Sequence, residues 1–418
     1  MSVSLVLLTR VLRVHDHPAL AAACRTSRQV PLFVVDPRLL NGLHRSPNRA
    51  TFLAQSLADL DGSLRGLGGA LVVRRGDPVD EAIRLAREVG AGELHVSADV
   101  TGYAQRRQRR LDLACHELGL TLHVHPGVTV VPAGALRPAD GDHYRVFTPY
   151  WRRWVGTPRR PLEPVPPGVR LPDGLDPGPL PAAEDLATGP RSPRLPIGGE
   201  EPARRRLAGW LRRGLAEYGQ HHNDLAGDRT SRLAPYLHLG CLSALEVAVR
   251  ADGRPGAEPF LRQLCWRDFH HQVLHARPDL PRRDYRLGKR VWRDRPEALA
   301  AWRDGRTGCP VVDAGMRQLR EEGWMPNRAR LLTASFLVKR LGVDWRLGAA
   351  HFFEWLVDGD VANNVGNWQW VAGTGNDPRP DRVFDPVRQG RRFDPAGDYV
   401  RRYVPERRTM RGGEVHEA

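Results

Sequence analysis

The first 130 residues alternate short runs of valine and leucine with segments of helical length, and this alternation constrains the fold more than any other feature. The predicted strands are residues 3–8, 30–35, 70–74, 93–97 and 120–125. Helix-length segments such as 51–67 and 78–89 lie between them. Strands that alternate with helices form a parallel sheet with both faces covered. We therefore predict a doubly wound, Rossmann-like α/β domain over residues 1–130, with ligand loops beyond the carboxyl ends of its strands.

The rest of the chain follows a different pattern. Residues 131–199 are rich in proline and glycine and lack apolar periodicity, which is typical of a long connector. Beyond residue 200 only helical spacing is found, and the predicted helices are 203–218, 243–250, 258–275, 296–304, 311–322, 327–341 and 345–357. We predict an all-α domain over residues 200–418.

Composition limits the class of protein. The formal net charge is +15, and this positive surplus favours a polyanionic partner such as nucleic acid. No apolar run approaches the roughly 18 residues of a membrane-spanning helix, so no membrane partner is expected. The five cysteines are widely spread and form no CxxC pair, which indicates neither a disulfide framework nor a zinc site. We expect a cytoplasmic protein.

Residues 343–386 have the highest density of aromatic, acidic and amide side chains in the chain. Gly359 interrupts a helical pattern between Asp358 and Asp360, and amides follow at Asn363, Asn364, Asn367 and Gln369. Two carboxylates with amides at a turn could bind a metal, cap the next helix or contact a large cofactor. The residues by themselves leave these alternatives open.

A second candidate segment offers groups for a phosphate. Thr230, Ser231 and Arg232 stand just before an apolar helical run, and a helix N-terminus with such donors can receive a phosphate group. A hydroxyl N-cap without a ligand is the alternative.

Segment 258–275 mixes polar and aromatic side chains on one helical stripe. Phe260, Gln263, Leu264 and Arg267 share this stripe, with Trp266 beside it. A hydrophobic core with no ligand would not require polar and aromatic side chains together on this stripe. No acidic residue stands at ligand spacing from the histidines of this segment, so we expect no metal site at His270, His271 and His275.

Several long motifs together resemble class I DNA photolyases of the photolyase and cryptochrome family. They are TRVLRVHDHPAL, GDRTSRLAPYL, TGCPVVDAGMRQL, GWMPNRARLLTASFLVKR and DGDVANNVGNWQW. The resemblance runs over essentially the whole chain. It implies an antenna-binding α/β domain, a helical domain that holds FAD, whose reduced form is active, and light-driven reversal of ultraviolet lesions in DNA.

The resemblance also assigns roles to residues around the flavin. Its diphosphate and ribityl chain would be held by Tyr218, Thr230, Ser231, Arg232, Leu233 and Ala234. Its isoalloxazine ring would lie among Trp324, Asn327, Arg330, Asp358, Asp360 and Asn364. Phe260, Arg267 and Gly359 would also contact the cofactor. Asn364 would face N5 of the ring, and Arg330, paired with Asp358, would steady the anionic reduced flavin. Electrons would reach the photoexcited flavin through Trp292, Trp345 and Trp368, although such residues are more often plain core aromatics.

The lesion would lie at a second group of side chains, Gln263, Trp266, Asn327, Arg328, Leu331, Trp370 and Arg382. Gln263 stands where dimer photolyases commonly have glutamate, Leu331 where they have methionine, and His222 where they have an arginine. Six-four photolyases have a histidine pair at the positions of Pro326 and Asn327, and neither of these residues can act as a general acid. We therefore predict repair of cyclobutane pyrimidine dimers, with a six-four photolyase or a cryptochrome-type light sensor as alternatives.

The sequence also bears on which antenna chromophore binds and on whether the chain assembles with partners. RSPNRATFL and Asp99 resemble the deazaflavin-binding pattern, so Arg49 and Asp99 would contact 8-hydroxy-deazaflavin; folate or no antenna are the alternatives. Sensors usually append a signalling extension, and the chain stops soon after VPERR, which favours repair. We expect ultraviolet-damaged DNA as the partner and a monomer without an obligate protein partner.

Overall fold

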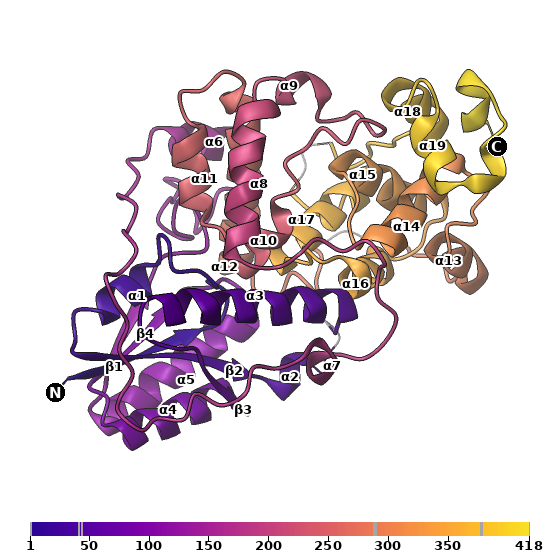
Figure 1. Cartoon of the computed structure of the whole chain (residues 1–418). Coiled ribbons are helices and arrows are strands. Elements are labelled where there is room, and N and C mark those ends of the chain that lie inside the picture. Colours follow the sequence, from indigo (N-terminus) through magenta and orange to yellow (C-terminus); the bar gives the residue numbers. More distant parts are fainter. Residues whose placement is uncertain (1, 41, 43–44, 287–290, 377–378, 418) are drawn as a thin grey trace.

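The N-terminal domain of the computed structural model is built on a parallel sheet (Figure 1). The structure describes residues 2–40, 42, 45–286, 291–376 and 379–417. The five strands of this sheet lie in the order β3-β2-β1-β4-β5. They are β1 (Val3–Leu8), β2 (Arg28–Val35), β3 (Val72–Arg75), β4 (Glu93–Ser97) and β5 (Thr121–His125). All neighbours pair in parallel, so the predicted α/β class is confirmed.

Helices cover both faces of this sheet. α4 (Pro78–Val89) and α5 (Gly102–Leu118) bury one face, where Leu5 and Leu94 of the strands pack with Leu85 and Leu111. α1 (Pro18–Ala23) and α3 (Pro47–Gly66) lie on the other face, and α2 (Pro37–Leu40) follows β2. Successive strand residues alternate between the two faces, so the continuous apolar runs fit a sheet that is buried on both sides.

The C-terminal half is helical, as predicted (Figure 1). Its helices are α8 (Glu200–Arg213), α9 (Tyr218–His221), α10 (Ala234–Leu239), α11 (Ala244–Ala251), α12 (Ala257–Ala276), α13 (Pro296–Arg303), α14 (Pro310–Glu322), α15 (Asn327–Ser335), α16 (Trp345–Trp355), α17 (Val361–Ala372), α18 (Pro386–Phe393) and α19 (Asp398–Tyr403). The single helix expected over 327–341 is α-helical only to Ser335 and continues as a π-helix over Phe336–Arg340. None of the described helices is long and apolar enough to cross a membrane.

The Pro/Gly-rich segment 131–199 contains two helices that the sequence did not predict. α6 (Phe147–Val155) packs against α12, and α7 (Ala183–Leu186) packs against α3. Between them the segment follows the α/β domain, where the Pro177 carbonyl accepts a hydrogen bond from Val73 N–H at 2.7 Å. α6 buries Phe147, Tyr150 and Trp154 at helical spacing, a short pattern that was overlooked within the Pro/Gly-rich segment.

The loop after β1 docks the two domains together. Arg13 in this loop is 1% exposed, and its guanidinium donates to the Gly240 carbonyl at 2.8 Å. Glu200 at the start of α8 accepts the Val14 N–H at 2.7 Å. Helix α3 lies between the sheet and the helical domain (Figure 1), where the Asn48 amide donates to the Trp355 carbonyl at 2.6 Å. The loops beyond β1 therefore meet the helical domain directly.

Candidate functional site

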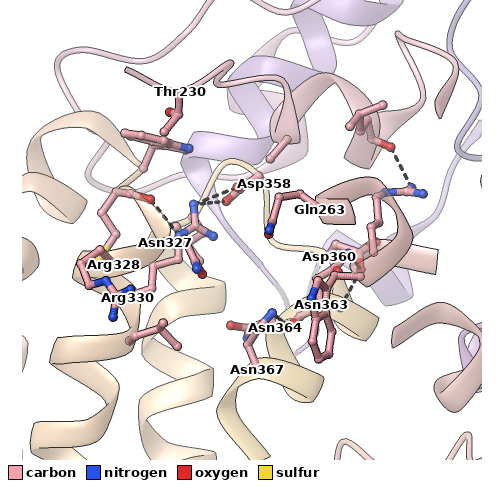
Figure 2. Close-up of a pocket in the computed structure, with 18 of the residues that line it drawn as sticks. Thr230, Gln263, Asn327, Arg328, Arg330, Asp358, Asp360, Asn363, Asn364 and Asn367 are labelled. Atoms are coloured by element: carbon pink, nitrogen blue, oxygen red, sulfur yellow. Dashed lines mark hydrogen bonds and ion pairs between the residues drawn. The ribbon is translucent and has the colours of Figure 1, made fainter. Parts of the chain in front are cut away.

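A cavity of about 460 Å³ opens in the helical domain. Its walls come from α9, the loop before α10, α12, α15, the turn after α16 and α17. Figure 2 shows polar side chains from these elements converging on it. The predicted residues that line it are Tyr218, Thr230, Ser231, Arg232, Leu233, Ala234, Phe260, Gln263, Trp266, Arg267, Trp324, Asn327, Arg328, Arg330, Leu331, Asp358, Asp360, Asn364, Trp368 and Trp370. The fold thus brings together positions as far apart in the chain as Tyr218 and Trp370.

An ion pair between Arg330 and Asp358 crosses one wall of the cavity (Figure 2). Nη2 of Arg330 lies 2.8 and 3.1 Å from the two carboxylate oxygens, and its Nε donates to the Met325 carbonyl. The predicted pairing of these two residues is confirmed. The carboxylate fixes the guanidinium at the edge of the cavity, where a positive charge can stabilise an anionic group.

Asp360 caps the helix that carries the amides. Its Oδ1 accepts the backbone N–H of Asn363 at 2.9 Å at the start of α17. Oδ2 receives Arg10 Nη2 at 2.7 Å and lies 3.5 Å from His271 Nε2. Burial works against ionisation here, but His271 and Arg10 hold the pKa of Asp360 well below its usual value. Of the alternatives left open for this turn, the helix cap is confirmed for Asp360.

Asn364 lies one turn into α17 and is 8% exposed. Its side-chain amide donates to the Ala349 carbonyl of α16 at 3.1 Å. This bond fixes the orientation of the amide group, and the carbonyl oxygen of the side chain remains for a ligand.

The loop before α10 adopts a strained backbone. Asp228 and Arg232 have φ values of 48° and 50°, in the left-handed region that side chains other than glycine rarely adopt. Arg232 lies 4.0 Å above the Trp324 ring and pairs with Asp228 and Glu322 at 2.8 Å. The Thr230 hydroxyl is buried without a hydrogen-bond partner in the described structure. A buried polar atom of this kind costs free energy unless a ligand satisfies it.

Amides and indoles surround the mouth of the cavity. Gln263 and Asn327 are exposed there. The Trp266 ring stacks on Phe147 of α6 with centroids 3.7 Å apart and planes 2° apart, so Phe147 supports one face of the indole. On the opposite wall, the Arg382 guanidinium lies 4.8 Å from the Trp370 ring.

The three tryptophans predicted to carry electrons differ in exposure. Trp368 lines the cavity and is 2% exposed, and its indole N–H has no partner in the described structure. Trp345 is 1% exposed and donates to Asp284 at 2.9 Å, whereas Trp292 is only partly buried. Trp302 is a further indole beside Trp368, with ring centroids 6.1 Å apart, and no sequence pattern distinguishes it.

Six predicted positions lie outside the cavity lining: Gly359, Arg382, Trp292, Trp345, Arg49 and Asp99. Arg49 reaches from α3 to the end of α16, where it donates to the carbonyls of Phe353 and Leu356. Burial lowers the pKa of Arg49 to about 10, with partial compensation by Asp358. Asp99 binds Arg10 at 3.1 Å. Arg49 is therefore engaged between the α/β domain and the helical domain, whereas Asp99 pairs with an arginine of its own domain.

Some residues that line the cavity were not among those predicted from the sequence. His238, Asn223 and Phe352 line the cavity without having been predicted, because nothing local distinguishes them from core residues. His270 also lines it, and burial together with His271 lowers its pKa to about 4. The fold also brings Asp360 within 3.5 Å of His271, a contact that spacing along the chain does not reveal.

Comparison with known proteins identifies the family. A model described as the FAD binding domain of DNA photolyase matches residues 260–418, and one described as DNA photolyase matches residues 4–168. A deoxyribodipyrimidine photo-lyase from Streptomyces griseus is 51% identical over 100% of this chain and 92% of its own length. The chain belongs to the photolyase and cryptochrome family. The predicted family is thus confirmed, and its relatives support the predicted class of enzyme.

Solved structures of this family share the fold. A class III photolyase from Agrobacterium tumefaciens is 31% identical, with a TM-score of 0.92 over 100% of this chain and 89% of its own. A cryptochrome from Synechocystis is 29% identical, with a TM-score of 0.93 over 100% of this chain and 91% of its own. The C-terminal half of this photolyase-family protein is an FAD-binding domain. The residues present fit FAD, because the unpartnered hydroxyl of Thr230 and indole N–H of Trp368 both line the cavity.

Proposed function

We propose that this protein repairs cyclobutane pyrimidine dimers in DNA under blue light, with FAD in the cavity of the helical domain. The observation that carries the proposal is that the cavity has two chemically different parts. Its interior holds the Arg330 and Asp358 pair and the buried Thr230 hydroxyl. Its mouth holds the exposed amides Gln263 and Asn327. A cofactor inside and a DNA lesion at the mouth would then share one cavity.

Each part of the cavity has a distinct task in this proposal. Reduced FAD, when bound and excited by light, supplies the electron that splits the two bonds of the cyclobutane ring. Arg330 favours the anionic form of the cofactor, and Asp358 holds that guanidinium in place. Asn364, fixed through Ala349, would lie against the flavin ring at N5. Tyr218, the loop 230–234 and Phe260 would hold the remainder of the cofactor.

The mouth would orient the flipped dinucleotide. Amides of Gln263 and Asn327 can donate to and accept from pyrimidine edges. The indoles of Trp266 and Trp370 offer stacking surfaces worth roughly 1–3 kcal/mol per base. Arg328 and Arg382 carry positive charge beside the cavity, in agreement with the net charge of +15. Leu331 completes the lining at this end.

The choice of cyclobutane dimers over six-four products follows from Pro326 and Asn327, which stand where six-four photolyases have a histidine pair. Pro326 and Asn327 cannot donate a proton to a leaving oxygen. Burial lowers the pKa of both His238 and His270, and that of His270 is about 4. These two cavity histidines are therefore neutral near pH 7, when a general acid would need to be charged.

Two defined oligonucleotides test the proposal. One carries a single cyclobutane thymine dimer and the other a single six-four product at the same position. The purified protein with reduced FAD should restore the first under blue light and leave the second unchanged. Dark incubation is the control. Repair of the six-four product would contradict the choice of lesion, and repair of neither would favour the sensor function, which the similarity to the Synechocystis cryptochrome keeps as a second candidate.

We also propose 8-hydroxy-deazaflavin as the antenna, on the resemblance of RSPNRATFL to the deazaflavin pattern. Reconstitution of the purified protein with deazaflavin and with folate, each followed by gel filtration, tests this assignment. Retention of folate alone would reverse it, and retention of neither would indicate a protein without an antenna. We further propose a cytoplasmic monomer, which cell fractionation and light scattering would test.

A further inference from the structure

Three histidines and a glutamate gather on the sheet of the α/β domain, outside the flavin cavity. Glu93 and His95 lie on β4, and His123 and His125 lie on the neighbouring strand β5. Alternate residues of a strand point to the same face, and the register places His95 opposite His123. The rings of His95 and His123 are stacked, with centroids 4.8 Å apart. The four side chains thus form one cluster on the face of the sheet that α1 partly covers.

The donor atoms of Glu93, His95 and His123 lie within 4.8 Å of one another. Metal to nitrogen bonds of about 2.0–2.1 Å in a tetrahedral site place ligand atoms roughly 3.3 Å apart. The carboxylate Oε2 of Glu93 and Nε2 of His95 are already 3.1 Å apart. Small side-chain rotations would therefore complete a three-ligand site. The Glu93 side chain is 39% exposed, which leaves a path for an ion and a position for a water ligand.

Neighbouring groups fix the orientation of these ligands. Ser4 of β1 donates to Glu93 Oε2 at 3.1 Å. His95 Nδ1 lies 3.0 Å from His125 Nε2, on the side of the ring away from Glu93. A histidine that binds a metal through one nitrogen normally donates its other N–H to such an acceptor.

We propose that Glu93, His95 and His123 bind one divalent transition-metal cation of the zinc type, with His125 as the positioning residue for His95. Two imidazoles and one carboxylate are the protein ligands of open zinc sites, and imidazole prefers zinc, nickel or copper to magnesium or calcium. β5 is the last strand of the sheet and pairs with β4 alone among the described strands. The cation would tie this edge strand to β4 and so stabilise the α/β domain.

Zinc binding to the full-length, FAD-loaded protein tests the proposal. After treatment with a chelator, equilibrium dialysis against zinc chloride with elemental analysis should give one zinc per chain. Zinc should also slow hydrogen exchange at the β5 amides. The variants His123→Ala and Glu93→Gln should bind at least tenfold more weakly, and His125→Ala about 10- to 100-fold more weakly. His116→Ala changes an exposed histidine of α5 and should bind as the parent does.

Two outcomes would overturn the site. One is a parent protein that binds no zinc at micromolar free concentration, and the other is a His123→Ala variant that binds zinc as tightly as the parent. The second result would place the metal on other groups, such as the partly buried thiol of Cys24. Flavin content and circular dichroism of each variant establish that it is folded, so weak binding in a folded variant is informative.

Discussion

Arg10 and Asp360 form an ion pair across 350 positions of the chain, with Nη2 of the arginine 2.7 Å from Oδ2 of the carboxylate. The same guanidinium binds Asp99 at 3.1 Å and donates to the His238 carbonyl at 2.9 Å. Asp360 in turn caps α17, which carries Asn364. One side chain of the α/β domain therefore stabilises the turn that shapes the flavin cavity.

Replacement of this arginine should weaken the docking of the two domains. Arg10→Gln leaves two buried carboxylates without their charge partner, and loss of one member of a buried pair costs about 3–5 kcal/mol. We expect a clear fall in the thermal unfolding midpoint and a lower FAD content. Arg65→Gln is the matched control, because its pair with Asp61 is 61% exposed on the arginine side and contributes little. Equal losses in the two variants would contradict the docking role.

The charge on Asp360 should make this stabilisation depend on pH. Its folded pKa lies well below the unfolded value of about 3.9, with Arg10, His238 and His271 facing the carboxylate. The ionised group therefore contributes stability above about pH 4, and this contribution is lost as the pH falls through the folded pKa.

Asp360→Asn retains an N-cap residue but removes the charge. The difference in thermal midpoint between parent and variant should be largest near neutrality and should narrow as the pH falls below about 4. Thermal scans of both proteins across this range measure it. A constant difference at every pH would show that ionisation of Asp360 does not stabilise the fold.

Trp368 is the indole of the proposed electron path that lines the cavity. Trp368→Phe should keep the fold and the FAD content but abolish photoreduction of the oxidised flavin, since phenylalanine cannot replace the oxidisable indole. Trp302→Phe is the control, because this ring also contacts Trp368 but lies outside the proposed path. The flavin absorbance during illumination measures both. Undiminished photoreduction in Trp368→Phe would eliminate this path.

Phe147 should influence the affinity for damaged DNA through Trp266. Phe147→Leu preserves apolar volume in the buried position but removes the ring that stacks on the indole at 3.7 Å. Loss of an aromatic pair is worth ~0.5–1.5 kcal/mol, so Kd for a dimer-containing oligonucleotide should rise roughly two- to tenfold. Fluorescence anisotropy measures it, and affinity for undamaged DNA should not change. An unchanged Kd for the dimer would argue against stacking on Trp266.

Arg382 should strengthen DNA binding through its positive charge and should not distinguish one base sequence from another. In Arg382→Gln, binding to DNA should weaken for every sequence, and the slope of log K against log salt should fall by about one. Arg109→Gln, on α5 of the α/β domain, is the control and should retain the parent slope. A loss of affinity that is confined to one sequence would point to base contacts instead.

Sequence periodicity located the five strands and the longer helices because strand and helix patterns arise within a few neighbouring residues. The runs 3–8 and 93–97 became strands with those same bounds. The motif around Asp358 and Asn364 was long enough to identify the family and to predict the pairing of Arg330 with Asp358. The nine-residue helix over Phe147–Val155 was not predicted, because its three apolar residues at helical spacing lie within a Pro/Gly-rich segment; the helix packs on α12.

Contacts between distant segments were decided only by the tertiary structure. The ion pair of Asp99 with Arg10 and the hydrogen bonds from Arg49 to the carbonyls that end α16 could not be predicted from the sequence. The cluster of Glu93, His95 and His123 likewise exists only once β4 and β5 lie side by side. The sequence alone determined the strands and the longer helices, since those preferences are local. The docking of the two domains decided which charged side chains form ion pairs. A buried charge is costly unless the fold places an opposite charge beside it.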